Sequence, residues 1–465
     1  MGRQPFGLAS PAAWLREAGA EVTCLDLSRS GAAVPSEHAV RSADLLAFYV
    51  PMHTATRLAV EWLPRLRAIN PHAHLCFYGL YAPLNEGYLR RLGAQTILGG
   101  EFEEGLVALV KRLAAGDGSR LASTAEFSER LPSEPAVPLA RQRFRVPDRS
   151  GLPDLGYYAR LEMPDGERRV VGYTEATRGC KHLCRHCPIV PVYQGRFRVV
   201  QRDVVLGDIR QQVAAGAAHI TFGDPDFFNG AGHSLAIVDE LQREFPRLTY
   251  DVTIKIEHLL RYAHLLPRLR ETGCLFVTTA VECLDDWVLR LFDKGHTRED
   301  FVRVVELFRE VGLALSPTFI PFHPWTTVES YREMLAILRD LVLAESIAPV
   351  QLAVRLLIPA QSKLLELPEI RERLGEFDER GLRYRWAYDD PRVERLYRTV
   401  RQIVGSGQGS GSSRAAVFAQ VWDAARRACQ MPIRAAESEP VQSRFLPKVL
   451  RDRVTIPYLT EPWFC

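Results

Sequence analysis

Three cysteines lie close together near the middle of the chain: Cys180, Cys184 and Cys187, separated by four and then three positions. This spacing constrains the chain more than any other feature, because three thiolates can hold three irons of a 4Fe-4S cluster and leave the fourth iron without a protein ligand. An iron with an open position is a place for chemistry as well as electron storage. The segment therefore predicts a reactive metal centre.

Two other interpretations of the cysteines have to be weighed. Positions i, i+4 and i+7 share one face of a helix, so the three thiols could be buried core residues. Gly179 and Pro188 bound the segment, however, and favour a loop. The residues between the cysteines also make a poor buried stripe: Lys181, His182, Arg185 and His186. The chemical alternative is a zinc site that adds His182 or His186 to the three thiolates.

The composition sets wider limits. A chain of 465 residues is long enough for about three domains. The net charge of +3 is too small to imply nucleic acid as a partner. We find no apolar run of about 18 residues and no basic-then-apolar leader, which predicts a cytoplasmic protein without a membrane partner. Nine cysteines spread thinly along the chain suit reduced thiols and a metal centre better than a disulfide framework.

Residues 1–116 alternate between helix and strand patterns, which predicts a doubly wound parallel-sheet domain of the Rossmann type. The expected strands cover 21–27, 45–49, 74–78 and 96–98, and the expected helices cover 9–18, 56–69, 84–92 and 102–114. Such a domain should open with a buried strand, yet the chain leads almost directly into a helix. A misassigned start codon is our hypothesis, and codons for a Val/Ile/Leu-rich strand just upstream of Met1 would support it.

A short loop, Gly99, Gly100 and Glu101, joins the last strand of this domain to its last helix. Backbone amides and a helix N-terminus at such a place could receive an anion or a nucleotide tail. The alternative is a glycine-assisted turn followed by acidic residues that suit the helix dipole.

The rest of the chain divides into three parts. Residues 117–150 are rich in Ser, Pro, Arg and Glu and predict a connection that crosses the surface. Residues 151–365 contain six strand patterns with helices between them, at 169–174, 219–222, 249–254, 275–281, 314–320 and 350–357. Residues 366–465 predict a helical extension, with a flexible Gly/Ser segment at 405–413 before an amphipathic helix at 414–429.

The cysteine spacing and the six strand units resemble the signature and the partial (β/α)6 barrel of the radical S-adenosylmethionine (SAM) enzymes. The resemblance implies that the open iron of a 4Fe-4S cluster chelates SAM and that one electron splits SAM to a 5'-deoxyadenosyl radical. It implies SAM contacts at five positions, although the common Gly-Gly-Glu form is absent: Gly223, Asp224 and Asp226 for the amino group, His186 for the adenine, and Glu282 for SAM or substrate. An Asp-Pro turn at Asp224 and a capping or solvated role for Glu282 are the alternatives.

Charged residues follow other strands of the barrel. Lys255 and Glu257 come after the third strand and Arg355 lies on the sixth. Because barrels of this kind place reactive groups at the carboxyl ends of their strands, these side chains could grip a polar substrate. Ordinary surface ion pairs explain them equally well.

The N-terminal domain is similar to the cobalamin-binding domain that precedes many radical SAM enzymes, which implies cobalamin near Gly99, Gly100 and Glu101. It departs from that pattern because no Asp-x-His-x-x-Gly supplies an axial histidine to cobalt. Either cobalamin binds without that ligand or the fold is retained without the cofactor.

The chain as a whole resembles the CUAEP/CCAEP-tail radical SAM family, through residues 3–11, the cysteine loop and residues 460–463. Members end in Cys-Sec-Ala-Glu-Pro or Cys-Cys-Ala-Glu-Pro, and here Cys465 is the last residue. We interpret this end as a UGA selenocysteine codon read as a stop. The resemblance implies a redox-active tail thiol that resolves a radical intermediate, binds a metal or protects the cluster.

Two functions of different classes follow. The first is an enzyme that cleaves SAM with electrons from a reductant such as flavodoxin or ferredoxin and uses the radical on a small-molecule or peptide substrate. With cobalamin, methyl transfer would be the expected reaction. The second is a non-catalytic iron-sulfur or zinc protein that carries electrons or serves as a scaffold.

Overall fold

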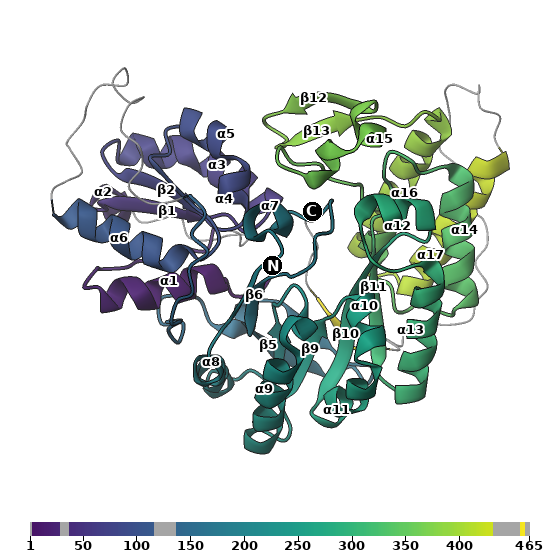
Figure 1. The fold of residues 1–465 in the computed structure, drawn as a ribbon, viewed down its shortest axis with the longest axis horizontal. Coiled ribbons are helices and arrows are strands. Elements are labelled where there is room, and N and C mark those ends of the chain that lie inside the picture. Colours follow the sequence, from purple (N-terminus) through teal and green to yellow (C-terminus); the bar gives the residue numbers. More distant parts are fainter. Residues whose placement is uncertain (1, 28–36, 116–135, 431–455, 461–465) are drawn as a thin grey trace.

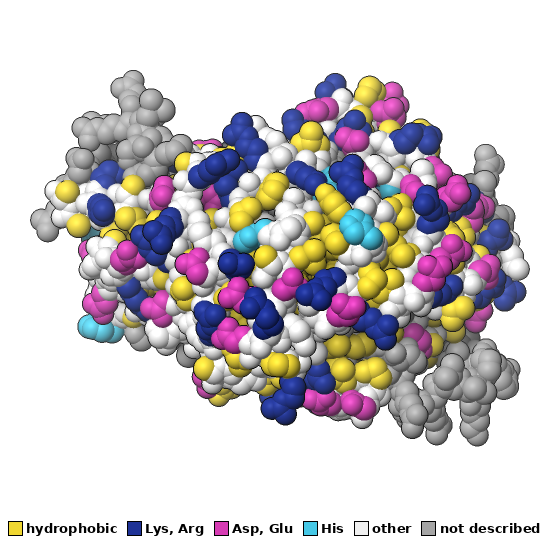
Figure 2. All heavy atoms as spheres, turned by 60° about the horizontal axis from the view of Figure 1, so that its bottom comes forward, with side chains coloured by type: hydrophobic (Ala, Val, Ile, Leu, Met, Phe, Trp, Pro, Cys, Tyr) yellow, Lys and Arg dark blue, Asp and Glu magenta, His cyan; other side chains and the backbone are white. Residues whose placement is uncertain are grey.

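The structure, a computed structural model, describes residues 2–27, 37–115, 136–430 and 456–460. Figure 1 shows an N-terminal lobe, drawn in purple and blue, beside a larger lobe drawn in teal and green. On the face drawn in Figure 2, basic and acidic side chains are interspersed, as expected for a nearly balanced net charge. Among the described residues, the helices are too short or too polar to cross a bilayer.

The N-terminal lobe is a parallel sheet with helices on both faces, as predicted. Its strands are β1 (Leu45–Tyr49), β2 (His74–Tyr78) and β3 (Thr96–Leu98), in the order β1-β2-β3. Successive side chains of a strand point to opposite faces. On β2, Cys76 and Tyr78 therefore pack with α1 and α6, whereas Leu75 and Phe77 pack with α3 and α5. The helices are α1 (Phe6–Glu17), α2 (Glu37–Arg41), α3 (His53–Ile69), α4 (Tyr81–Leu84), α5 (Glu86–Arg91) and α6 (Phe102–Ala114).

The strand expected at 21–27 does not form. This segment runs extended, and side chains from elsewhere hold it instead of a sheet neighbour: Arg16 donates to the Val22 carbonyl at 2.9 Å, and the Tyr158 hydroxyl donates to Asp26 at 3.0 Å. The helix expected at 84–92 forms as α5, which begins at Glu86, and Asn85 separates it from the short helix α4.

The larger lobe is built on one curved sheet with the order β11-β10-β9-β8-β5-β4-β14. The first five of these strands are parallel, and β4 and β14 add an antiparallel edge. The strands are β4 (Arg160–Glu162), β5 (Arg168–Thr174), β8 (His219–Phe222), β9 (Thr249–Thr253), β10 (Cys274–Glu282), β11 (Ala314–Phe319) and β14 (Tyr458–Leu459). All carboxyl ends of the parallel strands meet at one edge, where the candidate site lies.

Helices pack on the outer face of this sheet around the main core, in which Ile220, Tyr250 and Val277 are fully buried. The α-helices of this part are α7 (Ile189–Tyr193), α8 (Arg202–Ala214), α9 (Ala231–Glu244), α10 (Ile256–Arg261), α11 (Leu266–Glu271), α12 (Asp286–Phe292), α13 (Arg298–Val311) and α14 (Val328–Asp340). Short 3-10 helices are η1 (Leu155–Tyr157), η2 (Phe227–Gly230) and η3 (Ala263–Leu265), and a small ribbon pairs β6 (Thr177–Gly179) with β7 (Phe197–Val199).

The sixth strand expected at 350–357 is reduced to one parallel bridge between Phe322 and Arg355. The amide of Phe322 donates to the Val354 carbonyl at 3.2 Å, and that of Leu356 to the Phe322 carbonyl at 2.8 Å. The residues before the bridge form a 3-10 helix, η4 (Pro349–Leu352). The side chain of Gln351 takes the place of a strand neighbour, because its Oε1 accepts the amide of Phe319 at 3.0 Å. The barrel is therefore half-closed, with five parallel strands.

The C-terminal extension is helical, but its Gly/Ser segment is not a flexible linker. That expectation is wrong because α16 (Pro391–Ser410) runs through it and ends at Gly411, before α17 (Arg414–Gln430). Packing explains one of its glycines, since a Cβ atom on Gly407 would lie 2.6 Å from Cγ2 of Val417. The extension also contains η5 (Lys363–Glu366), α15 (Pro368–Arg371) and the antiparallel pair β12 (Leu374–Asp378) and β13 (Arg383–Trp386).

A buried ion-pair network joins the two lobes next to the cysteine loop. Arg178, on β6, contacts Glu103 at 2.6 Å, Glu175 at 2.9 Å and Glu101 at 3.5 Å. Glu101 and Glu103 belong to the N-terminal lobe, and both are at most 2% exposed. Burial raises the pKa of Glu101 to about 7. The network fixes the base of the cysteine loop against the N-terminal lobe.

The connection predicted at 117–150 is only partly described. Residues 116–135 lie outside the described residues. The part that follows lies against both lobes: Ala136 and Pro138 accept amides of the N-terminal lobe, and Arg149 forms a buried ion pair with Asp208 of α8.

Candidate functional site

The three cysteines lie in a loop between β6 and α7, at the carboxyl edge of the parallel sheet. Residues 180–186 are not helical, so the helical interpretation is excluded. Gly179 turns the chain into the loop with φ of 74°, and a Cβ atom there would lie 2.3 Å from the Tyr193 ring and 2.6 Å from the Arg196 carbonyl. Only glycine fits this turn.

The three thiols share one environment. Burial raises the pKa of Cys180 to about 11 and that of Cys187 to about 12, and Cys184 adds to both shifts. The buried Lys294 ammonium acts in the opposite direction on Cys187. Because thiolates at these positions require nearby positive charge, the donor set fits a metal centre that supplies it.

Both histidines of the zinc alternative are directed to carboxylates. Nε2 of His186 lies 3.1 Å from Oε1 of Glu282, and Nε2 of His182 lies 3.4 Å from Oδ2 of Asp226. Nε2 of each ring therefore faces a carboxylate. Three cysteines without a histidine suit the iron-sulfur interpretation better than a Cys3His zinc site.

At the end of β10, Glu282 contacts His186, which the sequence analysis singled out, and Lys294, which it did not. Its Oε1 contacts His186 and accepts from Nζ of Lys294 at 3.0 Å. Burial alone would raise the pKa of Glu282, but the Lys294 ammonium and His186 bring that pKa well below its usual value. An ionised carboxylate is therefore held in a buried position. The ring of His186 also lies 4.7 Å from the ring of Phe292.

The backbone at Glu282 is strained. Its φ is 72°, and the register between β10 and β11 shifts between Ala280 and Glu282. A bulge at the end of a strand re-aims the side chain that follows it. Strain of this kind in a residue other than glycine is concentrated at functional sites, so the geometry points to Glu282 as a working residue.

The predicted residues after β8 divide between two roles. Gly223 is packed closely, because a Cβ atom there would lie 1.8 Å from the hydroxyl of Tyr173. Asp224 accepts from the Ala176 amide at 2.9 Å and from the Thr177 hydroxyl at 2.6 Å, and burial raises its pKa to about 7. These contacts make Asp224 a support for the cysteine loop.

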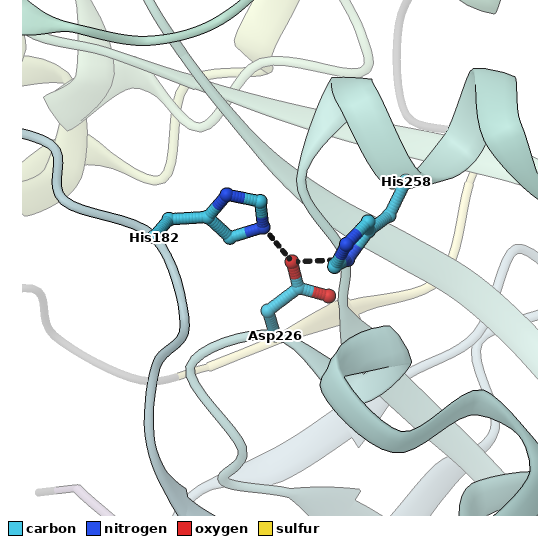
Figure 3. A group of neighbouring side chains, drawn as sticks. All are labelled: His182, Asp226 and His258. Atoms are coloured by element: carbon cyan, nitrogen blue, oxygen red, sulfur yellow. Dashed lines mark ion pairs between the residues drawn. The ribbon is translucent and has the colours of Figure 1, made fainter. Parts of the chain in front are cut away.

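Asp226 faces two imidazoles, as Figure 3 shows. Its Oδ1 accepts the Phe228 amide at 3.0 Å, and its Oδ2 lies 2.7 Å from Nδ1 of His258 and 3.4 Å from Nε2 of His182. Asp226 and His258 are almost completely buried. Sequence reasoning did not identify His258, because nothing in its local pattern distinguishes it from a core histidine.

The structure brings two of the three predicted substrate residues to this site. Nζ of Lys255 lies 2.9 Å from Oε2 of Glu257 and 3.2 Å from Nδ1 of His182. Arg355 is used elsewhere: its guanidinium contacts Glu394 of α16 at 3.0 Å and lies over the rings of Trp386, Tyr388 and Tyr397. The prediction of Arg355 as a substrate contact is not supported by this arrangement, which stabilises the C-terminal extension.

The loop predicted to receive a nucleotide tail is filled by the chain itself. The amide of Gly99 donates to the Ala136 carbonyl and that of Glu101 to the Pro138 carbonyl. A Cβ atom on Gly100 would lie 2.5 Å from the same Pro138 oxygen. These amides do not fit a cobalamin tail, and Cys465 of the predicted tail site lies outside the described residues.

Besides His258, sequence reasoning missed two further residues, Arg178 and Lys294. Arg178 lies two positions before Cys180, and its long-range carboxylate partners cannot be seen in the local sequence. Lys294 was noted only as part of a Lys-Gly-His-Thr resemblance, and its burial beside Glu282 is a property of the fold.

Part of the chain matches a known protein superfamily. Residues 174–338 match the model of the Radical SAM superfamily. The uS12 methylthiotransferase RimO of Bacteroides thetaiotaomicron is 24% identical over 55% of this chain and 62% of that protein. A tRNA-2-methylthio-N(6)-dimethylallyladenosine synthase of Thermobifida fusca is 25% identical over 50% of this chain and 48% of that protein. The matches therefore span less than two thirds of these relatives.

Solved structures share the fold. The radical SAM methyltransferase TsrM from Kitasatospora setae superposes with a TM-score of 0.58 at 20% identity, over 73% of this chain and 69% of that one. The cobalamin-dependent radical SAM enzyme OxsB superposes with a TM-score of 0.66 at 15% identity, over 88% of this chain and 65% of that one. The radical SAM domain implies a 4Fe-4S cluster and SAM as its cofactors. Residues 174–338 thus match the Radical SAM superfamily, and the chain shares its fold with cobalamin-dependent radical SAM enzymes.

Proposed function

We propose that this protein is a radical SAM enzyme that cleaves SAM reductively. The observation that carries the proposal is the placement of Cys180, Cys184 and Cys187 in one loop at the carboxyl edge of the parallel sheet, with both nearby histidines directed to carboxylates. A 4Fe-4S cluster bound by these thiols would supply one electron and an open coordination position for converting SAM to methionine and a 5'-deoxyadenosyl radical.

The residues of the chain contribute binding and positioning. Glu282, kept ionised by Lys294, is a hydrogen-bond acceptor for SAM or substrate at the end of β10. His186 and Phe292 place two rings beside it, which suits contact with an adenine. Asp224 holds the segment that leads into the cysteine loop to the end of β8, and Gly223 leaves room for the Tyr173 side chain. Lys255 and Glu257 extend the polar surface toward a substrate.

SAM cleavage can be measured directly. Protein reconstituted anaerobically and reduced with dithionite should convert SAM to 5'-deoxyadenosine and methionine, both quantified by mass spectrometry. Cys187→Ala should abolish the products and the cluster absorbance together. Cys429→Ala is the matched control, because this thiol lies on α17 and should leave both unchanged. Intact SAM with a fully loaded cluster would instead favour the non-catalytic electron carrier or scaffold.

Cobalamin-dependent methyl transfer is the second candidate, favoured by the N-terminal parallel-sheet lobe and by the fold shared with OxsB and TsrM. The contacts of Gly99 and Glu101 oppose a cobalamin tail site in their loop. Protein isolated anaerobically after growth with cobalamin tests this candidate: one corrin per chain by absorbance supports it, and protein without corrin removes it.

We also propose that the chain belongs to the CUAEP/CCAEP-tail radical SAM family. The resemblance to the CUAEP/CCAEP-tail family is supported by residues 3–11 and 460–463. UGA followed by Ala-Glu-Pro codons after codon 465 would support it, and any other continuation would remove it. A small-molecule or peptide substrate and a flavodoxin or ferredoxin reductant complete the proposed reaction in the cytoplasm.

A further inference from the structure

Two histidines and one aspartate beside the cysteine loop form a compact group of possible metal ligands. His182 comes from the loop itself, Asp226 from the turn after β8, and His258 from α10, and their side chains converge in Figure 3. One nitrogen or oxygen from each residue lies within 4.8 Å of the other two. Three segments that are separate in the sequence therefore present donor atoms to one point.

The polar atoms of this group face one another in close ion-pair contacts. Nδ1 of His258 is 2.7 Å from Oδ2 of Asp226, and Nε2 of His182 is 3.4 Å from the same oxygen. All three atoms are buried and, among the described residues, lack a hydrogen-bond partner. His258 is completely buried and Asp226 is 1% exposed. Buried polar atoms are nearly always hydrogen-bonded, so their concentration here points to a bound ligand.

The donor set selects the kind of ligand. Two imidazole nitrogens and one carboxylate oxygen are the protein ligands of the mononuclear Fe2+ site known as the facial triad, and the same types of ligand bind catalytic Zn2+. Both kinds of site keep open positions for water or substrate. We propose that His182, Asp226 and His258 bind one divalent first-row metal ion, separate from the iron-sulfur cluster of the cysteines.

The surroundings fix the orientation of two of these ligands. Oδ1 of Asp226 is held by the Phe228 amide, which leaves Oδ2 for the metal. On the far side of the His182 ring, Nδ1 lies 3.6 Å from Glu257 and 3.2 Å from Lys255. Because Nζ of Lys255 donates to Nδ1, the ring proton of His182 lies on Nε2, and a metal ion would displace that proton on binding.

The same three residues suit one other ligand, the ammonium group of SAM. The resemblance to radical SAM enzymes implies that role for Asp226. An ammonium and a metal ion cannot occupy this point together. The two roles differ in a simple observable, because only the metal role produces binding of a divalent ion in the absence of SAM.

Cobalt binding to the full-length chain tests the proposal. The variant with Cys180, Cys184 and Cys187 all replaced by alanine excludes binding of Co2+ by the cluster thiolates. Titration with Co2+, followed by its visible d–d absorption, should show one ion per chain. Adding Asp226→Asn, which keeps the acceptor for the Phe228 amide, should weaken Co2+ binding at least tenfold, and His182→Ala should do the same.

The matched control is His264→Ala, an exposed histidine on the neighbouring η3, which should leave the Co2+ affinity unchanged. Circular dichroism of each variant confirms folding. Zinc content gives a second readout on cluster-reconstituted protein with its cysteines intact: one retained Zn2+ after gel filtration, lost in Asp226→Asn. Absence of Co2+ and Zn2+ binding, or equal binding in Asp226→Asn and His264→Ala, would overturn the proposal. SAM cleavage is measured separately, so a failure of metal binding leaves the proposed function standing.

Discussion

Replacing Arg178 by methionine tests whether the lobes are coupled through one buried cation. Arg178 is 7% exposed and contacts Glu103 at 2.6 Å, Glu175 at 2.9 Å and Glu101 at 3.5 Å. Removing one partner of a buried ion pair leaves uncompensated charge and costs about 3–5 kcal/mol. We expect a loss of that size in the free energy of unfolding, reduced where Glu101 and Glu175 take up protons.

The loss is measured by urea denaturation, followed by tryptophan fluorescence and circular dichroism. Arg268→Met is the matched control: this arginine contacts Asp239 at 2.9 Å, but its side chain is 51% exposed. Exposed ion pairs contribute little to stability, so this variant should be close to the wild type. Adding Glu103→Gln to Arg178→Met should recover part of the loss. If Arg178→Met and Arg268→Met were equally mild, the proposed role of the network would be refuted.

Three further predictions follow from single contacts. Gly179→Ala should abolish the cluster absorbance, because backbone strain of about 1–2 kcal/mol at φ 74° adds to a collision with Tyr193. Gly216→Ala is the control: its φ is 93° and nothing lies within 4 Å, so it should show the backbone strain alone and keep the cluster. On α16, Gly407→Ala should destabilise the protein by about 1–3 kcal/mol, because the added methyl group overpacks against Val417. Gly405→Ala lies in open space and should stabilise the helix by about 0.5–1 kcal/mol. Thermal unfolding measures both effects. Burial raises the pKa of Glu101 from 4.5 to about 7, so the folded state holds a proton that the unfolded state has lost, and the free energy of unfolding should fall as pH rises from 5 to 7.5. Urea denaturation should show a smaller fall in Glu101→Gln. The same dependence of stability on pH in Glu101→Gln and the wild type would contradict this assignment.

The local features of the site could be predicted from the sequence because their information is local. The spacing of Cys180, Cys184 and Cys187 and the flanking Gly179 lie within a few residues, and the structure confirms a loop there. The position of Glu282 at a strand end could also be predicted, but its bulge and its partner Lys294 depend on how β10 and β11 pair.

The features that the sequence did not predict correctly depend on tertiary packing. Gly407 belongs to a composition typical of linkers, yet contact with Val417 keeps it helical. The sixth strand is reduced to one bridge, because the Gln351 side chain satisfies the edge of β11. His258 and Arg178 acquire their roles from partners distant in the sequence. Composition and periodicity carry no signal for such contacts.

The central claim is that three protein thiolates leave one iron of a 4Fe-4S cluster open for SAM. Mössbauer spectroscopy of protein reconstituted with 57Fe, recorded with and without SAM, tests it most directly. The account predicts that one iron subsite changes its parameters when SAM is added, while the other three stay constant. Four iron sites that are unaffected by SAM would contradict it.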